Sequence, residues 1–314
     1  MVTVFAPATV ANVACGYDVL GFAIDGPGDF IKASFADKPG LRITHITGDD
    51  GKLPIDPEKN TATVAALDLL HHLGKTGLGI ELEIHKRMPF SSGLGSSAAS
   101  AVAGAFAVNA LLGEPLSKKQ LLPFAVTGEA AASGSKHADN VAPCLFGGII
   151  FIRDNATLDF IELPVPDQLH AAVIYPEIEI PTKTAREILP TDFPLKNLTT
   201  QIGNLGALLS GLYTADYQLI GRSLHDHIAE PHRQKLIPEF YPAKQAALAA
   251  GALGFSISGA GPSVFTLSQG PATAQKSAEA ISRIFSNIPL KNSTYLSPIC
   301  PQGVRTVDNI PGVS

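Results

Sequence analysis

Glycine and serine dominate one stretch of the chain, Pro89-Phe90-Ser91-Ser92-Gly93-Leu94-Gly95-Ser96-Ser97-Ala98-Ala99. Apolar and polar residues alternate in the preceding residues 80–85, which predicts a strand, and the following residues 96–112 are rich in Ala and free of Pro, which predicts a helix. A helix that begins at a glycine loop presents unpaired backbone N–H groups, and these attract anions. The stretch therefore predicts a phosphate site, although a helix that packs tightly on a sheet would show the same pattern.

The same stretch differs from two familiar nucleotide motifs. No Lys follows the second Gly, so it is not a Walker A loop, and the glycine spacing is not the G-x-G-x-x-G of dinucleotide-binding proteins. The hydroxyls of Ser96 and Ser97 are placed to donate hydrogen bonds to a phosphate or to hold a Mg2+ ion.

Histidine, aspartate and asparagine gather in residues 134–143, just after Glu129 on a helix that a capping box at residues 117–120 would open. This cluster has the composition of a site, and it equally suits a loop whose side chains bond to its own backbone. Asn12 and Asp18 are polar positions among apolar residues, for which a turn is the leading interpretation.

Two further segments have more than one interpretation. A second glycine loop, Gly259-Ala260-Gly261-Pro262-Ser263, either lines the same cleft as the first or only closes a hairpin. His225, Asp226 and His227 are consecutive, which spreads them around a helix and predicts a solvated helix face instead of a metal site.

Composition limits the classes of protein to which the chain can belong. Its 314 residues suffice for two domains, and 45% hydrophobic with 16% charged residues is typical of an ordered globular protein. A net charge of −5 without runs of Lys or Arg argues against nucleic-acid binding. The N-terminus lacks the pattern of a signal peptide, and residues 98–112 are too few to span a bilayer, so a soluble protein without membrane contact is expected. Cys15, Cys144 and Cys300 are far apart, which predicts neither disulfides nor a zinc site and favours a reducing cytoplasm.

Hydrophobic periodicity predicts a mixture of strands and helices around these residues. A polar, proline-containing stretch at residues 153–168 is the best candidate for a domain boundary, and beyond it the order strand, helices, two strands, helix, strand is typical of a ferredoxin-like α+β sandwich. The expected strands cover residues 2–5, a segment near Phe22, and residues 30–35, 41–47, 80–85, 149–152, 169–175, 254–266 (two strands) and 294–297. One expected helix begins at Asn60. Further expected helices cover residues 96–112, 198–212, 219–228, 241–250 and 272–285.

Three separated motifs together resemble the GHMP small-molecule kinases, which include galactokinase, homoserine kinase, mevalonate kinase and phosphomevalonate kinase. Residues 89–98 resemble their P-x-x-x-G-L-G-S-S-A loop, residues 259–263 their third motif, and Pro7-Ala8-Thr9 with Asn12 and Asp18 their first. Within this family, A-T-x-A-N-x-x-x-G-x-D-V-L-G near the start and H-A-D-N-V-A-P at residues 137–143 are similar to the homoserine kinases. The likeness runs from about Val4 to the third motif, in the same order and spacing.

The resemblance implies a two-domain α+β fold that uses ATP and Mg2+. Residues 1–160 would form the ATP-binding N-terminal domain and residues 161–314 the ferredoxin-like C-terminal domain. Backbone amides from Gly93 to Ser97 would hold the ATP phosphates, and Ser97 with Glu129 would bind Mg2+. The implied ATP-binding residues are Pro89, Phe90, Ser91, Ser92, Gly93, Leu94, Gly95, Ser96, Ser97, Ala98 and Ala99.

The resemblance also implies the substrate, L-homoserine, whose side-chain hydroxyl would become O-phospho-L-homoserine in threonine biosynthesis. Asp18 and Asp139 are suited to its ammonium group, and which of them takes that role is open. Arg186 and Arg233 are suited to clamp its carboxylate. The residues implied around the amino acid are Asn12, Asp18, His137, Asp139, Asn140, Arg186 and Arg233.

Asn140 bears on the mechanism, because mevalonate kinases carry at this position an Asp that is taken as a base. An amide cannot accept the hydroxyl proton, so Asn140 is expected to orient the hydroxyl for in-line attack without a strong base. Asn140, Glu129 and Ser97 are thus the expected catalytic residues. Cys15 departs from the Pro that homoserine kinases often have, and a buried, inert thiol is expected there.

Three rival functions remain from the sequence: another GHMP kinase, a non-catalytic GHMP-fold metabolite sensor, and a sugar-phosphate isomerase that uses the helix end only as an anion site. The presence of Ser97, Glu129 and Asn140 together argues against the sensor, which has no need of metal ligands. The sequence does not determine the oligomeric state, for which a homodimer is one option.

Overall fold

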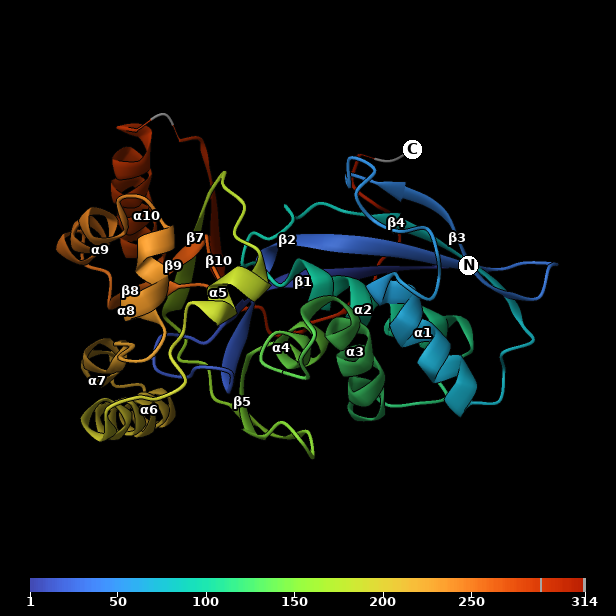
Figure 1. Cartoon of the computed structure of the whole chain (residues 1–314), viewed down its shortest axis with the longest axis horizontal. Coiled ribbons are helices and arrows are strands. Elements are labelled where there is room, and N and C mark those ends of the chain that lie inside the picture. Colours follow the sequence, from blue (N-terminus) through green and yellow to red (C-terminus); the bar gives the residue numbers. More distant parts are fainter. Residues whose placement is uncertain (289, 313–314) are drawn as a thin grey trace.

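Two sheets form the framework of the fold, one for each half of the chain, and they lie side by side (Figure 1). The computed structural model describes residues 1–288 and 290–312. The larger sheet has the strand order β11-β1-β2-β4-β3, while β5 pairs with one end of β2 and with β6. Its strands are β1 (Val2–Ala11), β2 (Leu20–Phe35), β3 (Gly40–Thr47), β4 (Gly79–His85), β5 (Ile149–Asp154), β6 (Asp159–Leu163) and β11 (Arg305–Thr306).

Four helices of the N-terminal half lie on one side of this sheet (Figure 1). Asn60 caps the first of them, since its Oδ1 atom accepts a hydrogen bond of 3.1 Å from the Ala62 N–H. Gly104 in α2 faces α1 so closely that a Cβ there would lie 2.1 Å from the Ala62 carbonyl oxygen, which explains the small residues of α2. The helices are α1 (Thr61–His72), α2 (Ser96–Leu111), α3 (Lys118–Ser133) and α4 (Val141–Phe146).

The second sheet is antiparallel with the order β10-β7-β9-β8, and α9 and α10 pack against each other with α10 on the sheet. This arrangement confirms the expected α+β class and ferredoxin-like order of elements. The strands are β7 (Leu169–Pro176), β8 (Gly254–Ile257), β9 (Val264–Gln269) and β10 (Asn292–Pro298), and the helices are α5 (Thr182–Glu187), α6 (Leu195–Thr214), α7 (Tyr217–Ser223), α8 (Glu230–Arg233), the 3-10 helix η1 (Gln234–Leu236), α9 (Phe240–Ala249) and α10 (Pro271–Ser286).

The two halves share a hydrophobic core, and one strand of the C-terminal half joins the first sheet. The rings of Phe22 in β2 and Phe265 in β9 meet edge to face, with centroids 5.9 Å apart, inside one continuous apolar cluster. The C-terminal segment returns to the first sheet, where β11 pairs with β1. The expected boundary after residue 160 falls within β6, which pairs with β5, so that division of the chain stays a prediction.

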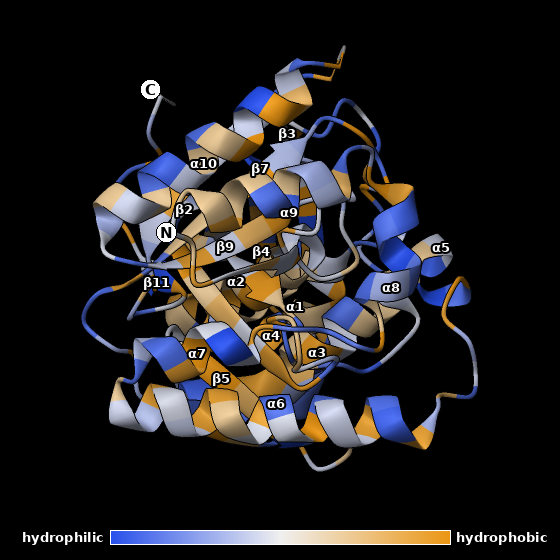
Figure 2. Ribbon diagram, turned by 90° about the vertical axis from the view of Figure 1, so that its left-hand side faces the viewer, coloured by the Kyte–Doolittle hydropathy of each residue, from blue (hydrophilic) through white to orange (hydrophobic). Residues whose placement is uncertain are grey.

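Hydropathy follows this layering (Figure 2). The central strands and α2 are largely apolar, whereas the outer helices α6 and α10 carry both polar and apolar residues along their length. Within the described residues, no helix combines the length and apolar character needed to cross a membrane.

The predictions from the sequence were wrong for several segments. The strands expected near Phe22 and at residues 30–35 are one strand, β2, because residues 24–27 bulge between the pairs Thr9–Ala23 and Pro7–Gly28 and the ladder then continues. The helix expected at residues 219–228 ends at Ser223, so the solvated helix face predicted for residues 225–227 was wrong. Asp226 instead accepts hydrogen bonds from the backbone N–H groups of residues 228–230, at the start of α8.

Candidate active site

The glycine loop joins β4 to α2, as the sequence predicts, and leaves the first turn of α2 open. Ser91, Gly93 and Gly95 have positive φ angles of 49°, 80° and 69°, and Gly95 is the N-cap without any side-chain cap on the helix. A Cβ at Gly95 would lie 2.1 Å from Thr9 Oγ1, so only glycine fits. The uncapped backbone N–H groups at this helix start are suited to bind an anion.

Residues distant in the sequence hold the tip of this loop in place. The backbone N–H of Thr9 in β1 donates to the Leu94 carbonyl at 3.0 Å. From the second glycine loop, the Ser258 hydroxyl donates to the Gly93 carbonyl at 2.6 Å and the Ser263 N–H to the Ser92 carbonyl at 3.0 Å. The second loop joins β8 to β9, contacts the first loop, and lines the same pocket with Gly259 and Ala260, so the interpretation that it only closes a hairpin is wrong.

Ser97 and Glu129 meet at the start of α2. The Ser97 hydroxyl donates to Glu129 Oε1 at 3.0 Å, while Glu129 Oε2 is buried and has no partner among the residues that the structure describes. Burial raises the pKa of Glu129 to about 7, an effect that the Ser97 hydrogen bond and Lys86 reduce. A hydroxyl next to a carboxylate with a free, buried oxygen fits a hard cation such as Mg2+. In the described part of the chain, no cluster of three or more His, Cys, Asp and Glu residues has the geometry of a metal site.

A polar pocket opens next to Glu129, between the two halves of the chain. Besides Glu129 Oε2, three buried atoms on its lining lack partners within the described residues, namely Ser135 Oγ, His137 Nδ1 and Arg186 Nε. Buried polar atoms normally have hydrogen-bond partners, so this concentration indicates that the pocket receives a polar ligand. All seven residues expected around the amino acid line this one pocket: Asn12, Asp18, His137, Asp139, Asn140, Arg186 and Arg233.

Asp18 and Arg186 form an ion pair at the pocket. Arg186 Nη1 and Nη2 lie 3.2 and 3.3 Å from the two carboxylate oxygens of Asp18, and His137 Nδ1 lies 3.6 Å from Asp18 Oδ2. Burial lowers the pKa of His137, which Asp18 partly offsets. Because the Arg186 and Asp18 side chains are 38% and 20% exposed, this pair contributes little to stability.

Arg233 presents a second cation to the pocket from the other side. It is 3% exposed, and its Nε and Nη1 atoms donate only to the carbonyls of Ala185 and Gly259, at 2.8 and 3.0 Å. Its guanidinium lies 5.3 Å from the centroid of the Tyr17 ring. No carboxylate hydrogen-bonds to this buried cation in the described residues, so an anionic ligand would supply its missing partner.

Asn12 organises the turn that carries Asp18. Its Oδ1 atom accepts from the Asp18 N–H at 3.0 Å and its Nδ2 atom donates to the Gly259 carbonyl at 2.8 Å. Both Asn12 and Asp18 have positive φ angles, of 70° and 58°. The turn interpretation is therefore confirmed, and the turn also brings Asp18 to the pocket.

Asp139 and Asn140 lie where the pocket meets the glycine loop. Asp139 is 5% exposed, and burial, followed by the charge of Asp18, raises its pKa to about 7. Asn140 Oδ1 accepts the Thr9 hydroxyl at 2.7 Å, which leaves the amide NH2 group as the donor for a ligand. Asn140 Oδ1 would also lie 2.9 Å from a Cβ at Gly95, so it directly adjoins the loop.

Not every residue of the expected phosphate stretch offers its side chain. Leu94, Ala98 and Ala99 are 0% exposed and belong to the apolar core, so their side chains are not available to a ligand. The sequence interpretation missed Thr9 as a hydrogen-bond partner and Tyr17 as the aromatic neighbour of Arg233. Cys15 is buried, as expected, and burial raises its pKa to about 12, which disfavours the reactive thiolate.

Comparisons with known proteins agree with this geometry. The family model for the GHMP kinases N terminal domain matches residues 60–148, and that for the GHMP kinases C terminal matches residues 203–287. A homoserine kinase of Chlorobium phaeobacteroides (strain BS1) is 48% identical over 98% of this chain and 99% of its own length.

Solved structures show the same similarity in three dimensions. A crystal structure of homoserine kinase from Cytophaga hutchinsonii has a TM-score of 0.95 and 53% identity, covering 98% of this chain and 97% of its own. L. major mevalonate kinase in complex with R-mevalonate has a TM-score of 0.66 over 94% of this chain and 95% of its own. At 19% identity, this second likeness concerns the fold alone.

Proposed function

The chain belongs to the homoserine kinases, a group within the GHMP kinases, and on that premise we propose that it transfers the γ-phosphoryl group of ATP to the side-chain hydroxyl of L-homoserine. The product would be O-phospho-L-homoserine, an intermediate for threonine biosynthesis. The observation that carries this proposal is a pocket with unpaired acidic, basic and polar groups directly beside an uncapped helix N-terminus.

The glycine loop is the proposed binding site of the ATP phosphates. Backbone N–H groups at the start of α2 would donate to the phosphate oxygens, and the positive end of the helix dipole would stabilise their charge. Ser97 and Glu129 would hold Mg2+, which when bound neutralises charge on the phosphates. The unpartnered Glu129 Oε2 atom supports this assignment.

The pocket contains two groups of opposite charge for each end of an amino acid. Asp18 and Asp139 would accept hydrogen bonds from the ammonium group, and Arg186 and Arg233 would bind the carboxylate. The Asp18–Arg186 pair would open on binding, because the substrate ammonium group would take the place of Arg186 at Asp18 and the substrate carboxylate that of Asp18 at Arg186. Asn12 and His137 would complete the pocket by fixing the turn and by hydrogen bonding.

The reaction needs alignment more than a base. The hydroxyl oxygen of homoserine would attack the γ-phosphorus in line, the bond from this phosphorus to the bridging oxygen would break, and ADP would leave with the bond electrons. The hydroxyl proton would leave on an oxygen of the transferred phosphoryl group. Because Thr9 already occupies Asn140 Oδ1, the Asn140 NH2 group would donate to the hydroxyl oxygen and orient it.

A substrate panel tests this proposal. ADP release is coupled to a spectroscopic assay with homoserine, mevalonate, shikimate and a sugar as acceptors, each with MgATP. We expect rapid turnover with homoserine and rates near background with the others, since only an amino acid satisfies both Asp18 and Arg233. Equal or faster turnover of another acceptor would assign the chain to a different GHMP kinase activity, and tight ATP binding without any acceptor would favour the metabolite sensor.

A further inference from the structure

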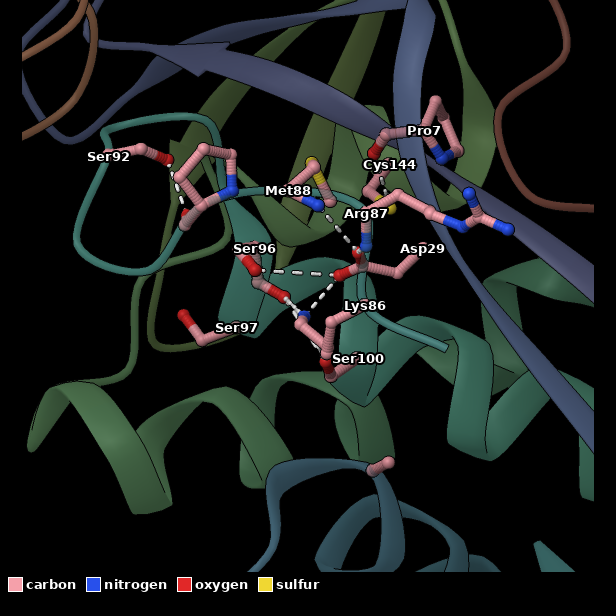
Figure 3. Close-up of polar contacts among 12 residues, drawn as sticks. Pro7, Asp29, Lys86, Arg87, Met88, Ser92, Ser96, Ser97, Ser100 and Cys144 are labelled. Atoms are coloured by element: carbon pink, nitrogen blue, oxygen red, sulfur yellow. Dashed lines mark hydrogen bonds and ion pairs between the residues drawn. The ribbon is translucent and has the colours of Figure 1, made fainter. Parts of the chain in front are cut away.

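A buried ion pair, Asp29 with Lys86, lies beneath the glycine loop (Figure 3). Asp29 belongs to β2 and Lys86 directly follows β4, and the two residues are 0% and 4% exposed. Neither residue belongs to the three motifs, and neither lines the polar pocket. A buried ion pair contributes little to stability by itself, so its location raises the question of what it positions.

All three donors of the Lys86 ammonium group are used inside the protein. They bind Asp29 Oδ2, the Ser96 carbonyl at 2.9 Å and the Ser100 hydroxyl at 2.8 Å. Lys86 therefore has no donor left for a phosphate. Ser96 and Ser100 lie one helical turn apart at the start of α2, so Lys86 fixes the orientation of the turn whose N–H groups are uncapped.

Asp29 holds the chain where it enters the loop. Its Oδ1 atom accepts the backbone N–H of Arg87 at 2.8 Å and that of Met88 at 3.2 Å. Its Oδ2 atom, besides Lys86, lies 3.5 Å from the Ser96 hydroxyl on the far side of the loop. Figure 3 shows Ser97 outside this cluster of contacts, with its hydroxyl directed away from Lys86.

The pair thus fastens both ends of the loop, residues 87–88 and residues 96–100, while other elements hold its tip at residues 92–94. We propose that Asp29 and Lys86 are positioning residues for phosphate binding, which act through the backbone N–H groups of the loop without touching the nucleotide. The proposal rests on the proposed role of this loop in ATP binding. It predicts that removing both charges weakens ATP binding and leaves homoserine binding intact.

The test is the double variant Asp29→Leu/Lys86→Met. Replacing a buried ion pair by apolar residues of similar volume is often close to neutral for stability, so this variant is expected to fold. We expect its Kd for a nonhydrolysable ATP analogue to rise about tenfold and its kcat to fall about 100-fold, because a misplacement of about 1 Å has effects of this size. Its KM for homoserine should stay within about twofold of the parent.

The matched control is Lys32→Gln/Glu83→Gln. Lys32 lies on β2 three residues after Asp29, and Glu83 lies on β4 three residues before Lys86, so this second pair joins the same strands, with a distance of 3.0 Å, away from the loop. It should leave the Kd, kcat and both KM values unchanged.

The outcomes separate this proposal from the proposed function. If the parent binds the analogue and the double variant binds it equally well, or if Kd and the homoserine KM change together, the positioning role is refuted. If the parent does not bind the analogue, the proposed function fails first. Asp29→Asn provides a milder second variant, because it keeps the size of the side chain while removing the charge that faces Lys86. Faster hydrogen exchange of residues 87–98 in this variant supports the proposal, and unchanged exchange with unchanged Kd refutes it.

Discussion

Two ion pairs near the glycine loop serve opposite needs. Asp29 and Lys86 are almost completely buried, with side chains 0% and 1% exposed, and their polar atoms make hydrogen bonds to other groups of the protein. Asp18 and Arg186 are 20% and 38% exposed, and Arg186 Nε has no partner within the described residues. The first pair completes a rigid support, whereas the second belongs to a pocket that a ligand must complete.

This difference separates the parts of the molecule that hold from the parts that bind. Under the loop, protein groups satisfy one another, so the loop has its shape before any ligand arrives. In the pocket, several polar atoms have no partner among the residues that the structure describes, and there Arg233 has no carboxylate bonded to it, so these groups are available to a ligand. Substitutions under the loop should therefore change the stability of the fold and the binding of ATP. Substitutions in the pocket should change the binding of homoserine.

The largest expected effect is on stability. Lys86→Met leaves Asp29 buried without its cation and should lower the free energy of unfolding by about 3–5 kcal/mol, as for other broken buried pairs. Asp18→Asn removes a partner whose side chain is 20% exposed and should lower it by less than about 1 kcal/mol. Urea unfolding followed by circular dichroism measures both values. Equal losses in the two variants would erase the distinction between the pairs.

The next effect concerns the substrate. Arg233→Met should reduce kcat/KM for homoserine by about 10²–10³-fold, because a buried cation that pairs with a ligand carboxylate contributes on this scale. The KM for ATP should stay close to that of the parent. Arg283→Met is the control, since Arg283 pairs with Glu279 on the exposed surface of α10 and should leave both parameters unchanged. An increase mainly in the KM for ATP would place Arg233 outside the amino-acid site.

A smaller effect is expected for Asn140→Asp, which tests the role of the amide at the border of the two regions. The Thr9 hydroxyl can still donate to the new carboxylate, but the donor to the substrate hydroxyl is lost, so kcat should fall by about tenfold with an unchanged pH profile. Steady-state kinetics between pH 6 and 9 measure both properties. A rise in kcat would mean that a base at this position helps the reaction and would contradict an orienting role.

The smallest effect is a pH dependence of stability in the ligand-free chain. Burial raises the pKa of Glu129 from its usual value of 4.5 to about 7, so the folded chain binds this proton more tightly than the unfolded chain does. The resulting stability is present below about pH 4.5 and is lost as the pH rises through about 7. The Tm of Glu129→Gln should therefore fall less steeply than that of the parent between pH 5 and 8, by a few degrees.

Glu114→Gln is the control for this pH dependence, since Glu114 is exposed, and it should follow the parent. Parallel curves for Glu129→Gln and the parent would show that Glu129 is not titrating in this range. With MgATP bound, the Tm of the parent should no longer fall more steeply with pH than that of Glu129→Gln, because the proposed cation favours the ionised carboxylate of Glu129.

Local patterns sufficed to predict the elements that carry the loop. Alternation identified β4, and the Ala-rich, Pro-free run identified α2, because both signals come from neighbouring residues. The resemblance named the residues that meet in the pocket, though their roles stay proposals. Asp29 and Lys86 gave no such signal, since they are 57 positions apart and only the pairing of β2 with β4 brings them together.

Segments with mixed signals were misjudged for related reasons. Gly26, Pro27 and Gly28 have the composition of a turn, but β2 continues past them through a bulge that only the pairing with β1 reveals. Residues 159–163 form an exposed edge strand, β6, inside the stretch that was interpreted as a domain boundary, and only the pairing with β5 reveals it. Asp226 lies beyond the end of α7 and accepts hydrogen bonds from backbone N–H groups at the start of α8, a contact that spacing alone cannot show.

A crystal structure with a nonhydrolysable ATP analogue, Mg2+ and homoserine tests the central claim most directly. The predicted result places the β- and γ-phosphates within hydrogen-bond distance of the backbone N–H groups at the start of α2. It also places the homoserine hydroxyl between Asn140 and the γ-phosphorus, with the Asp18–Arg186 pair opened. Nucleotide bound elsewhere, with the start of α2 free of phosphate, would contradict the account.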